Sequence, residues 1–157
     1  MMTLESELKL KKPIKLLSHR ALLNIYFTSS CLKKKADEFF RQFGLTDVQF
    51  NLLILLAIHS GSKGGLSQAQ LSDMMLVNRA NITSLIDRME KAELVERTDA
   101  PNDRRYNIIK MTPKGKKLFA KVEPLYSKQI RQLMAVLNES EQKGLVKALG
   151  KIRKELS

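Results

Sequence analysis

The stretch from residue 66 to residue 115 constrains the fold most, because it predicts two short, capped helices with almost no residues between them. The side chain of Ser67 can accept a hydrogen bond from the backbone N–H of Gln70, whose side chain can reach back to Ser67, so a helix should begin at Gln68. Asn78 is suited to cap a second helix directly after it. In that second helix the apolar residues recur with helical periodicity, so one stripe should face a core while the opposite side faces outward.

The outward side of the second helix carries short polar side chains near the helix N-terminus. Small residues let a helix backbone enter the major groove of DNA, where hydroxyls, amides and the helix N-terminus can reach base edges and phosphates. An ordinary solvated face is the alternative for a lone helix. The residues that we expect to contact DNA from the two helices are Gln68, Arg79, Ala80, Asn81, Thr83, Ser84 and Arg88.

A predicted hairpin follows the two helices. Strands are expected at 93–97 and 106–111, on either side of a polar, turn-forming loop. The loop ends in Arg104 and Arg105, and arginines at a hairpin tip suit a narrow, electronegative minor groove. Asp103 lies two residues before Arg105, close enough to orient its guanidinium by a charge-assisted hydrogen bond, although a plain surface ion pair is the alternative. Two helices and a hairpin in this order predict a winged helix-turn-helix, a fold that commonly binds duplex DNA.

The run from Gly44 to Gly115 resembles the MarR family of bacterial transcription regulators. The segments that carry the resemblance are Gly44-Leu45-Thr46, the helix at 79–91, Leu94-Val95-Glu96-Arg97, Asp103-Arg104-Arg105 and Met111-Thr112-Pro113-Lys114-Gly115. They stand in the family's order and spacing. The resemblance implies a mostly helical homodimer that binds pseudo-palindromic operators in double-stranded DNA and is released by a small ligand or by oxidation. Many members have a hydroxyl residue in place of Asn81 and a basic residue in place of Ser84, so the operator sequence cannot be carried over.

Length and composition fit a single domain at 1–157, because 157 residues with 43% hydrophobic content can bury one core. The expected fold class is mainly α, with a winged helix-turn-helix unit at 45–112. The flanking segments 1–44 and 113–157 should form long helices that act as dimerisation helices, and together they make the dimer frame.

Four further helices are expected around the winged helix-turn-helix. One runs from Pro13 to Phe43 with Gly44 as its stop, and a very apolar one follows a Thr46–Gln49 cap and continues through Ile58. Another long helix opens at Thr112-Pro113. The last one follows an Asn138 cap and carries an apolar stripe of Leu145, Leu149, Ile152 and Leu156. That stripe needs a partner surface, which we expect to be the N-terminal helix of a second subunit, with docking inside one chain as the alternative.

The net charge of +12 supports attraction to a polyanion but does not locate the binding site. Residues 66–112 carry seven Lys and Arg against seven Asp and Glu, so the unit expected to contact DNA bases is itself neutral. The excess lies elsewhere in the chain. Lys114, Lys116 and Lys117, just after the hairpin, are the expected phosphate contacts.

The sequence argues against an enzyme and predicts neither a cofactor nor a metal site. Cys31 and His19 lie twelve residues apart in one predicted helix, which separates them by about 18 Å along its axis, too far for a nucleophile and its base. His59 has no second metal ligand at suitable spacing, and Gly61–Gly65 is expected to be an exposed turn rather than a phosphate-binding loop. The longest apolar run, 52–58, is too short to cross a bilayer, so we expect a cytoplasmic protein without membrane contact.

Regulation is expected to come from a small-molecule effector, aromatic or anionic, that binds in a crevice between the dimer frame and the winged unit and releases a repressor from DNA. A redox-sensing regulator based on Cys31 is one alternative, since nearby lysines can lower the pKa of a thiol. Thiol-sensing relatives, however, carry their reactive cysteine nearer the start of the first helix, and a buried cysteine is the commoner state. A winged helix that contacts protein or RNA is the other alternative.

Overall fold

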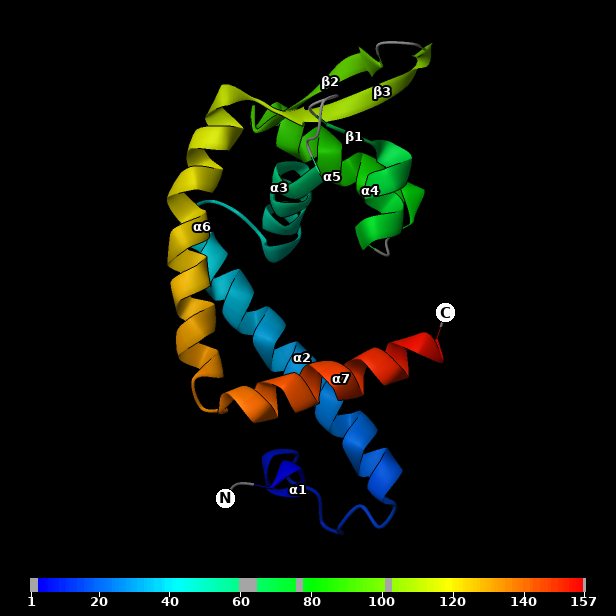
Figure 1. The fold of residues 1–157 in the computed structure, drawn as a ribbon, viewed down its shortest axis with the longest axis vertical. Coiled ribbons are helices and arrows are strands. Elements are labelled where there is room, and N and C mark those ends of the chain that lie inside the picture. The colour runs from blue at the N-terminus through cyan, green and yellow to red at the C-terminus, as the bar shows by residue number, and fades with distance from the viewer. Residues whose placement is uncertain (1–2, 60–64, 76–77, 101–102, 157) are drawn as a thin grey trace.

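The computed structural model describes residues 3–59, 65–75, 78–100 and 103–156, and it confirms a mainly helical chain with a small sheet (Figure 1). The helices are α1 (Leu4–Glu7), α2 (Leu17–Arg41), α3 (Asp47–His59), α4 (Gln68–Met75), α5 (Arg79–Lys91), α6 (Pro113–Met134) and α7 (Glu139–Lys154). The strands are β1 (Leu66–Ser67), β2 (Val95–Ala100) and β3 (Asp103–Met111). Helices α3 to α5 gather with the sheet at one end, from which α2 and α6 extend toward α7 and α1 (Figure 1).

The predicted caps are confirmed at each helix start where one was expected. The Ser67 backbone N–H donates to Gln70 Oε1 over 2.9 Å, and the Gln70 N–H donates to Ser67 Oγ over 3.2 Å. Asn78 accepts from the backbone N–H three residues on at 2.8 Å. The caps expected for α3 and α7 also form, through Thr46–Gln49 and Asn138–Glu141, and at the expected start of α6 the Gly115 N–H donates to the Thr112 hydroxyl oxygen. These bonds satisfy backbone donors that a helix N-terminus leaves unpaired, which is why the helices begin at these residues.

The N-terminal helix differs from the prediction. It begins at Leu17 rather than Pro13, and a short helix, α1, comes before it. Leu16 is extended, with φ −83° and ψ 118°, and makes no side-chain cap, because no Ser, Thr, Asp or Asn stands between Pro13 and Leu17. The expected end is close to the observed one: α2 ends at Arg41, and Gly44 takes a left-handed φ of +70° in the turn that follows.

The hairpin is longer than predicted. Strands β2 and β3 pair antiparallel beyond the expected limits, with Thr98 opposite Ile108 and Asp99 opposite Asn107, so most of the predicted loop at 98–105 is strand. The prediction was wrong because cross-strand backbone hydrogen bonds do not depend on side-chain polarity, and a hairpin that projects into solvent tolerates polar residues on both faces. The expected first strand also began too early, since Glu93 has a left-handed φ of 60° in the turn after α5. Strand β1 completes the sheet against β3, in the order β1-β3-β2.

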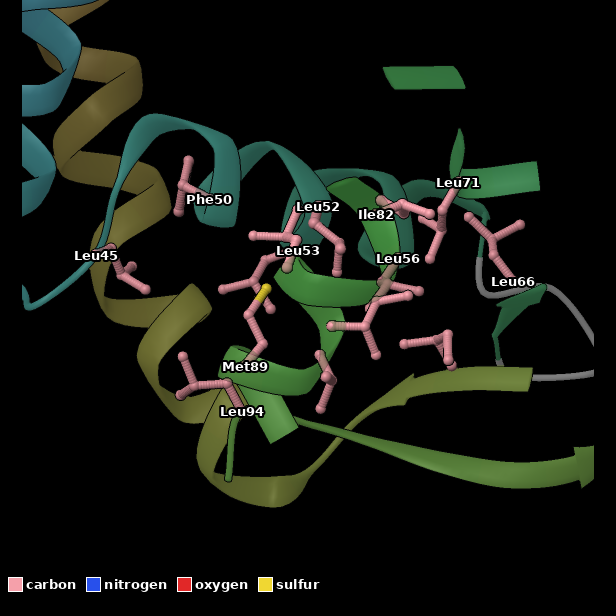
Figure 2. Packing of buried hydrophobic residues seen from close by; sticks show 14 of the residues in the cluster. Leu45, Phe50, Leu52, Leu53, Leu56, Leu66, Leu71, Ile82, Met89 and Leu94 are labelled. Carbon is pink, nitrogen blue, oxygen red and sulfur yellow. The ribbon is translucent and has the colours of Figure 1, made fainter. Parts of the chain in front are cut away.

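The hydrophobic core lies between α3, α5 and the sheet (Figure 2). The predicted apolar stripe of α5 is confirmed, since Ile82, Leu85, Ile86 and Met89 are all buried. They share one buried cluster with Leu52, Leu53 and Leu56 of α3, as expected for a central apolar helix, and Figure 2 shows Ile82 and Met89 beside these leucines. Burying one stripe of α5 leaves its other side exposed beside the hairpin.

An aromatic cluster joins this core to the long helices. Phe40 of α2 stacks on Phe50 of α3 with 4.5 Å between ring centroids, and Tyr126 of α6 contacts Phe40 at 4.7 Å. Phe119, also on α6, stacks on Phe50 at 5.6 Å. The helix pair α2 and α6 is therefore packed directly against the unit that carries α5.

Candidate nucleic-acid interface

The outward face of α5 lies where the sequence placed it. Ala80, Asn81, Ser84 and Arg88 are exposed, and Thr83 is half-buried. The exposed Asn78 caps this helix, since its side chain accepts from the backbone N–H of Asn81. This face therefore offers amide, hydroxyl and guanidinium groups on a helix whose opposite side is fixed in the core, an arrangement suited to insertion into a groove. The side chain of Arg79 lies outside the described residues.

Helix α4 supports α5 through a polar contact. The half-buried Gln68, the first residue of α4, donates from Nε2 to the hydroxyl oxygen of Thr83 on α5. The structure thus brings together two residues that the sequence assigned to DNA contact from separate helices. Along α5, the Arg88 Nε donates to the backbone carbonyl of Ser84 over 3.2 Å, which directs the guanidinium back along the outward face.

The wing, which is the β2–β3 hairpin, is linked to α5 by an ion-pair cluster that was not predicted from the sequence. Arg97 of β2 contacts Asp87 of α5 at 2.5 Å between Nη2 and Oδ1, and its Nη1 contacts Glu90 Oε2. The sequence placed Arg97 only in an expected strand and gave no partner for it. Two acidic residues one turn apart on a helix, followed by an arginine in the next strand, are the signal that could have found the cluster.

The wing tip is described only in its backbone. Asp103, Arg104 and Arg105 belong to β3, but their side chains lie outside the described residues, as do Pro101 and Asn102 entirely. The predicted orientation of Arg105 by Asp103 therefore stays a prediction. Most of the predicted Gly61–Gly65 turn also lies outside the described residues.

The lysines after the hairpin divide into two groups. Lys114 pairs with Glu93 over 2.8 Å between Nζ and Oε2, and its hydrogen bond and positive charge lower the pKa of the Glu93 carboxyl. Lys116 and Lys117 are exposed. Both partners of the Lys114 pair are largely exposed, so that pair is weak and does not prevent Lys114 from reaching an anion.

Other kinds of site find little support among the described residues. No group of three or more histidine, cysteine, aspartate or glutamate side chains is arranged there to hold a metal ion. In the same part of the chain, no helix has the length and apolar character needed to cross a membrane. Cys31 is exposed, unlike the buried state common for cysteine.

The comparisons with known proteins agree with this geometry. The model of the MarR family matches residues 43–105. The uncharacterized HTH-type transcriptional regulator YsmB of Bacillus subtilis is 30% identical, over 82% of this chain and 85% of that protein. The HTH-type transcriptional regulator PecS of Dickeya dadantii is 27% identical, over 82% of this chain and 76% of that protein.

Solved structures show the same fold. The S. aureus MepR–DNA complex aligns with a TM-score of 0.77 at 25% identity, covering 85% of this chain and 95% of that one. AbsC, a MarR family transcriptional regulator from Streptomyces coelicolor, aligns with a TM-score of 0.80 at 22% identity, covering 92% and 98% of the two chains. The chain has a winged helix-turn-helix with an outward polar face on its second helix, and YsmB is 30% identical over 82% of this chain. The chain therefore belongs to the MarR family of transcription regulators.

Proposed function

We propose that the chain is a repressor that binds a pseudo-palindromic operator in duplex DNA as a homodimer and is released by a small ligand. The observation that carries the DNA-binding part is the exposed polar face of α5, held against the core and beside the wing. The solved complex of the similar MepR with DNA supports it. We assign residues 45–112 to the winged unit and 1–44 and 113–157 to the dimer frame.

The proposed contacts fall into two classes. The residues that enter the major groove are Gln68 of α4 and, from α5, Arg79, Ala80, Asn81, Thr83, Ser84 and Arg88. The residues that act in the minor groove are Asp103, Arg104 and Arg105 of the hairpin tip. Lys114 and Lys116 contact phosphates. Base contacts confer specificity, whereas phosphate contacts add affinity for any sequence and make it depend on salt.

Fluorescence anisotropy with a duplex from upstream of the chain's own gene, and with a scrambled duplex, tests these roles. Asn81→Ala should weaken operator binding by about 1 to 3 kcal/mol and leave scrambled-DNA binding almost unchanged. Thr83→Ala should act alike, although it also removes the acceptor of Gln68. Lys116→Ala should weaken binding to both duplexes and lower the salt slope by about 1.

The matched control is Lys147→Ala, which removes the same charge from an exposed position on α7, far along the chain from the wing. It should leave both affinities nearly unchanged. Equal losses on both duplexes for the Asn81 and Lys116 variants would show that the roles are wrongly assigned. A wild-type protein without preference for the upstream duplex would favour a winged helix that contacts protein or RNA.

The dimer part of the proposal rests on exposed apolar side chains outside the core. Helix α7 has no buried residue within the described chain, and Leu145 and Ile152 of its stripe are 41% and 43% exposed. Leu17, Leu22 and Tyr26 of α2 are also exposed. Apolar surface on this scale is best covered by a second copy, with α7 of one subunit against the N-terminal helix of the other.

Sedimentation velocity tests the dimer. Ile152→Glu places a charge in the α7 stripe and should shift the protein toward the monomer at micromolar concentration. Lys151→Glu, on the outer side of the same helix, makes a larger change in charge and should leave the dimer intact. A monomeric wild-type protein, or equal behaviour of the two variants, would contradict the proposed interface.

The ligand part rests on a crevice where the frame meets the winged unit. It has a volume of about 460 Å³ and lies between α2, α3 and α4. Lys33 offers a positive charge and Asn51 an amide, while Ile54, Leu55 and Met75 supply apolar walls. One cation in an apolar crevice suits a small aromatic anion, because the ring packs on the walls and the anion pairs with the lysine.

Benzoate serves as a probe of this chemistry. It should raise the thermal midpoint of the protein and weaken operator binding, and Lys33→Ala should reduce both effects. Lys34→Ala is the control, since Lys34 is an exposed neighbour outside the lining of this crevice. Equal responses of the two variants would remove Lys33 from the proposed site.

A further inference from the structure

Arg97 connects the wing to α5, the helix proposed to enter the major groove, through two side-chain hydrogen bonds and one backbone hydrogen bond. Its Nη2 lies 2.5 Å from Asp87 Oδ1, its Nη1 donates to Glu90 Oε2, and its backbone N–H donates to Glu90 Oε1 over 3.0 Å. The main chain and the side chain of one β2 residue are thus both held by α5. An arginine can do this because its planar fork offers several donors in fixed directions.

The position of Arg97 lets these bonds set the direction of the wing. Arg97 lies at the middle of β2, where it pairs with Ile109 of β3 in the core, and β2 continues from it to Ala100 near the wing tip. On the other side, Asp87 stands one helical turn after Ser84 on the outward face of α5. The wing and the outward face are therefore joined at one point near their common base.

The ion pairs of Arg97 also neutralise negative charge beside the outward face of α5. Asp87 is 58% exposed, and without Arg97 it would present an unpaired carboxylate beside the face proposed to meet DNA. Arg97 is only 22% exposed. Burial lowers the pKa of Arg97, but hydrogen bonds to Asp87 and Glu90 and their negative charges outweigh it and raise that pKa, so the guanidinium stays charged.

We propose that Arg97 is a positioning residue for DNA binding, which holds the wing at a set distance from α5 so that both reach adjacent grooves of one duplex. Asp87 is then an anchor for Arg97, and this acidic residue strengthens binding to a polyanion. The inference rests on the proposed DNA binding. This role predicts that removing the charge of Asp87 weakens DNA binding, whereas removing a negative charge beside DNA ordinarily tightens it.

The test compares Asp87→Asn with Asp99→Asn, its matched control. Each substitution replaces one exposed carboxylate with an amide of nearly the same shape. Asp99 lies on β2, nearer the wing tip. Asp87→Asn should weaken binding to the upstream duplex about three- to tenfold. Asp99→Asn should leave binding unchanged or make it tighter. Arg97→Gln should weaken binding more than Asp87→Asn, and Arg97→Lys should recover part of the loss.

Footprinting separates positioning from a general loss of structure. In the Asp87→Asn and Arg97→Gln complexes, hydroxyl-radical protection of the minor groove by the wing should weaken, while methylation protection of guanine N7 in the major groove persists. Urea unfolding checks that both variants fold. Tighter binding by Asp87→Asn, or equal weakening of both footprints, would overturn the inference. Absence of wild-type binding to the duplex would overturn the proposed function together with it.

Discussion

Gly115→Ala should destabilise the protein because α6 begins in contact with the backbone of the α5–β2 turn. Gly115 is buried, and a Cβ built on it would overlap the carbonyl oxygen of Leu94. Two bonds hold the same joint: the Thr112 N–H donates to the Leu94 carbonyl over 3.2 Å, and the Thr112 hydroxyl donates to the Glu93 carbonyl over 2.6 Å. Backbone on both sides leaves no flexible side chain that could move away.

The magnitude follows from these contacts. Forcing an extra carbon into a tight site costs about 1 to 3 kcal/mol. Separating α6 from the turn also strains or breaks the two hydrogen bonds of Thr112, each worth about 0.5 to 1.5 kcal/mol. Replacing a helical glycine returns up to about 1 kcal/mol of backbone entropy. The net expected loss for Gly115→Ala is about 3 kcal/mol in the free energy of unfolding.

Urea unfolding at pH 7, followed by circular dichroism at a matched protein concentration, measures this loss. The control is Gly150→Ala on α7, where the added Cβ would meet only the end of Arg153, at 3.9 Å. On the face of α7 away from the apolar stripe, this substitution should be neutral or stabilising by up to about 1 kcal/mol. If Gly115→Ala proved as stable as the wild type, the argument for a rigid joint between α6 and the winged unit would be refuted.

Three further predictions concern the wing, the thiol of Cys31 and the phenol of Tyr126. Arg105→Ala should cost more operator affinity than Arg104→Ala in anisotropy measurements, and the reverse order would remove the proposed orientation of the former. Cys31→Ser should keep ligand-dependent release in cells, and loss of derepression under hydroperoxide stress would instead support a redox switch. Burial and then the charge of Asp47 raise the pKa of Tyr126, so Asp47→Asn should lower that pKa without bringing it to the ordinary value, as measured by NMR of ring-labelled tyrosine.

The same aspartate affects stability in a defined direction. Burial, followed by the charge of Asp37, raises the pKa of Asp47 above 3.8, so the folded chain binds a proton that the unfolded chain has released. Stability from this group is therefore present at low pH and is lost as pH rises from about 3.8 through the raised pKa. Asp47→Asn should flatten the slope of unfolding free energy against pH in that window. An unchanged slope would show that other groups dominate it.

Local hydrogen bonding let the sequence predict where helices begin. Ser67 with Gln70, and Asn138 with Glu141, are three residues apart, so each cap depends only on the chain around it. The buried stripe of α5 was predictable for a similar reason, because helical periodicity alone puts Ile82 and Met89 on one side. Together with the family resemblance, these signals were enough for the fold class and for the outward face of α5.

Boundaries were less predictable where a segment depends on a partner strand. The polar residues Thr98 and Asp99 read as loop, yet they pair with β3 because the opposite strand supplies their backbone hydrogen bonds. The start of α2 at Leu17 was missed for another reason. The helix was expected from Pro13, because the segment before Leu17 has no capping residue that would mark where the helix begins.

Only the tertiary structure decided which distant residues meet. Arg97 reaches Asp87 across ten positions of sequence, and Gly115 meets the Leu94 carbonyl across the whole hairpin. Neither contact follows from local spacing, because each depends on how the β2–β3 hairpin folds back along α5 and on where α6 leaves the sheet. The sequence by itself determined the elements and the face that they present, while their packing determined how that face is aimed and what holds it there.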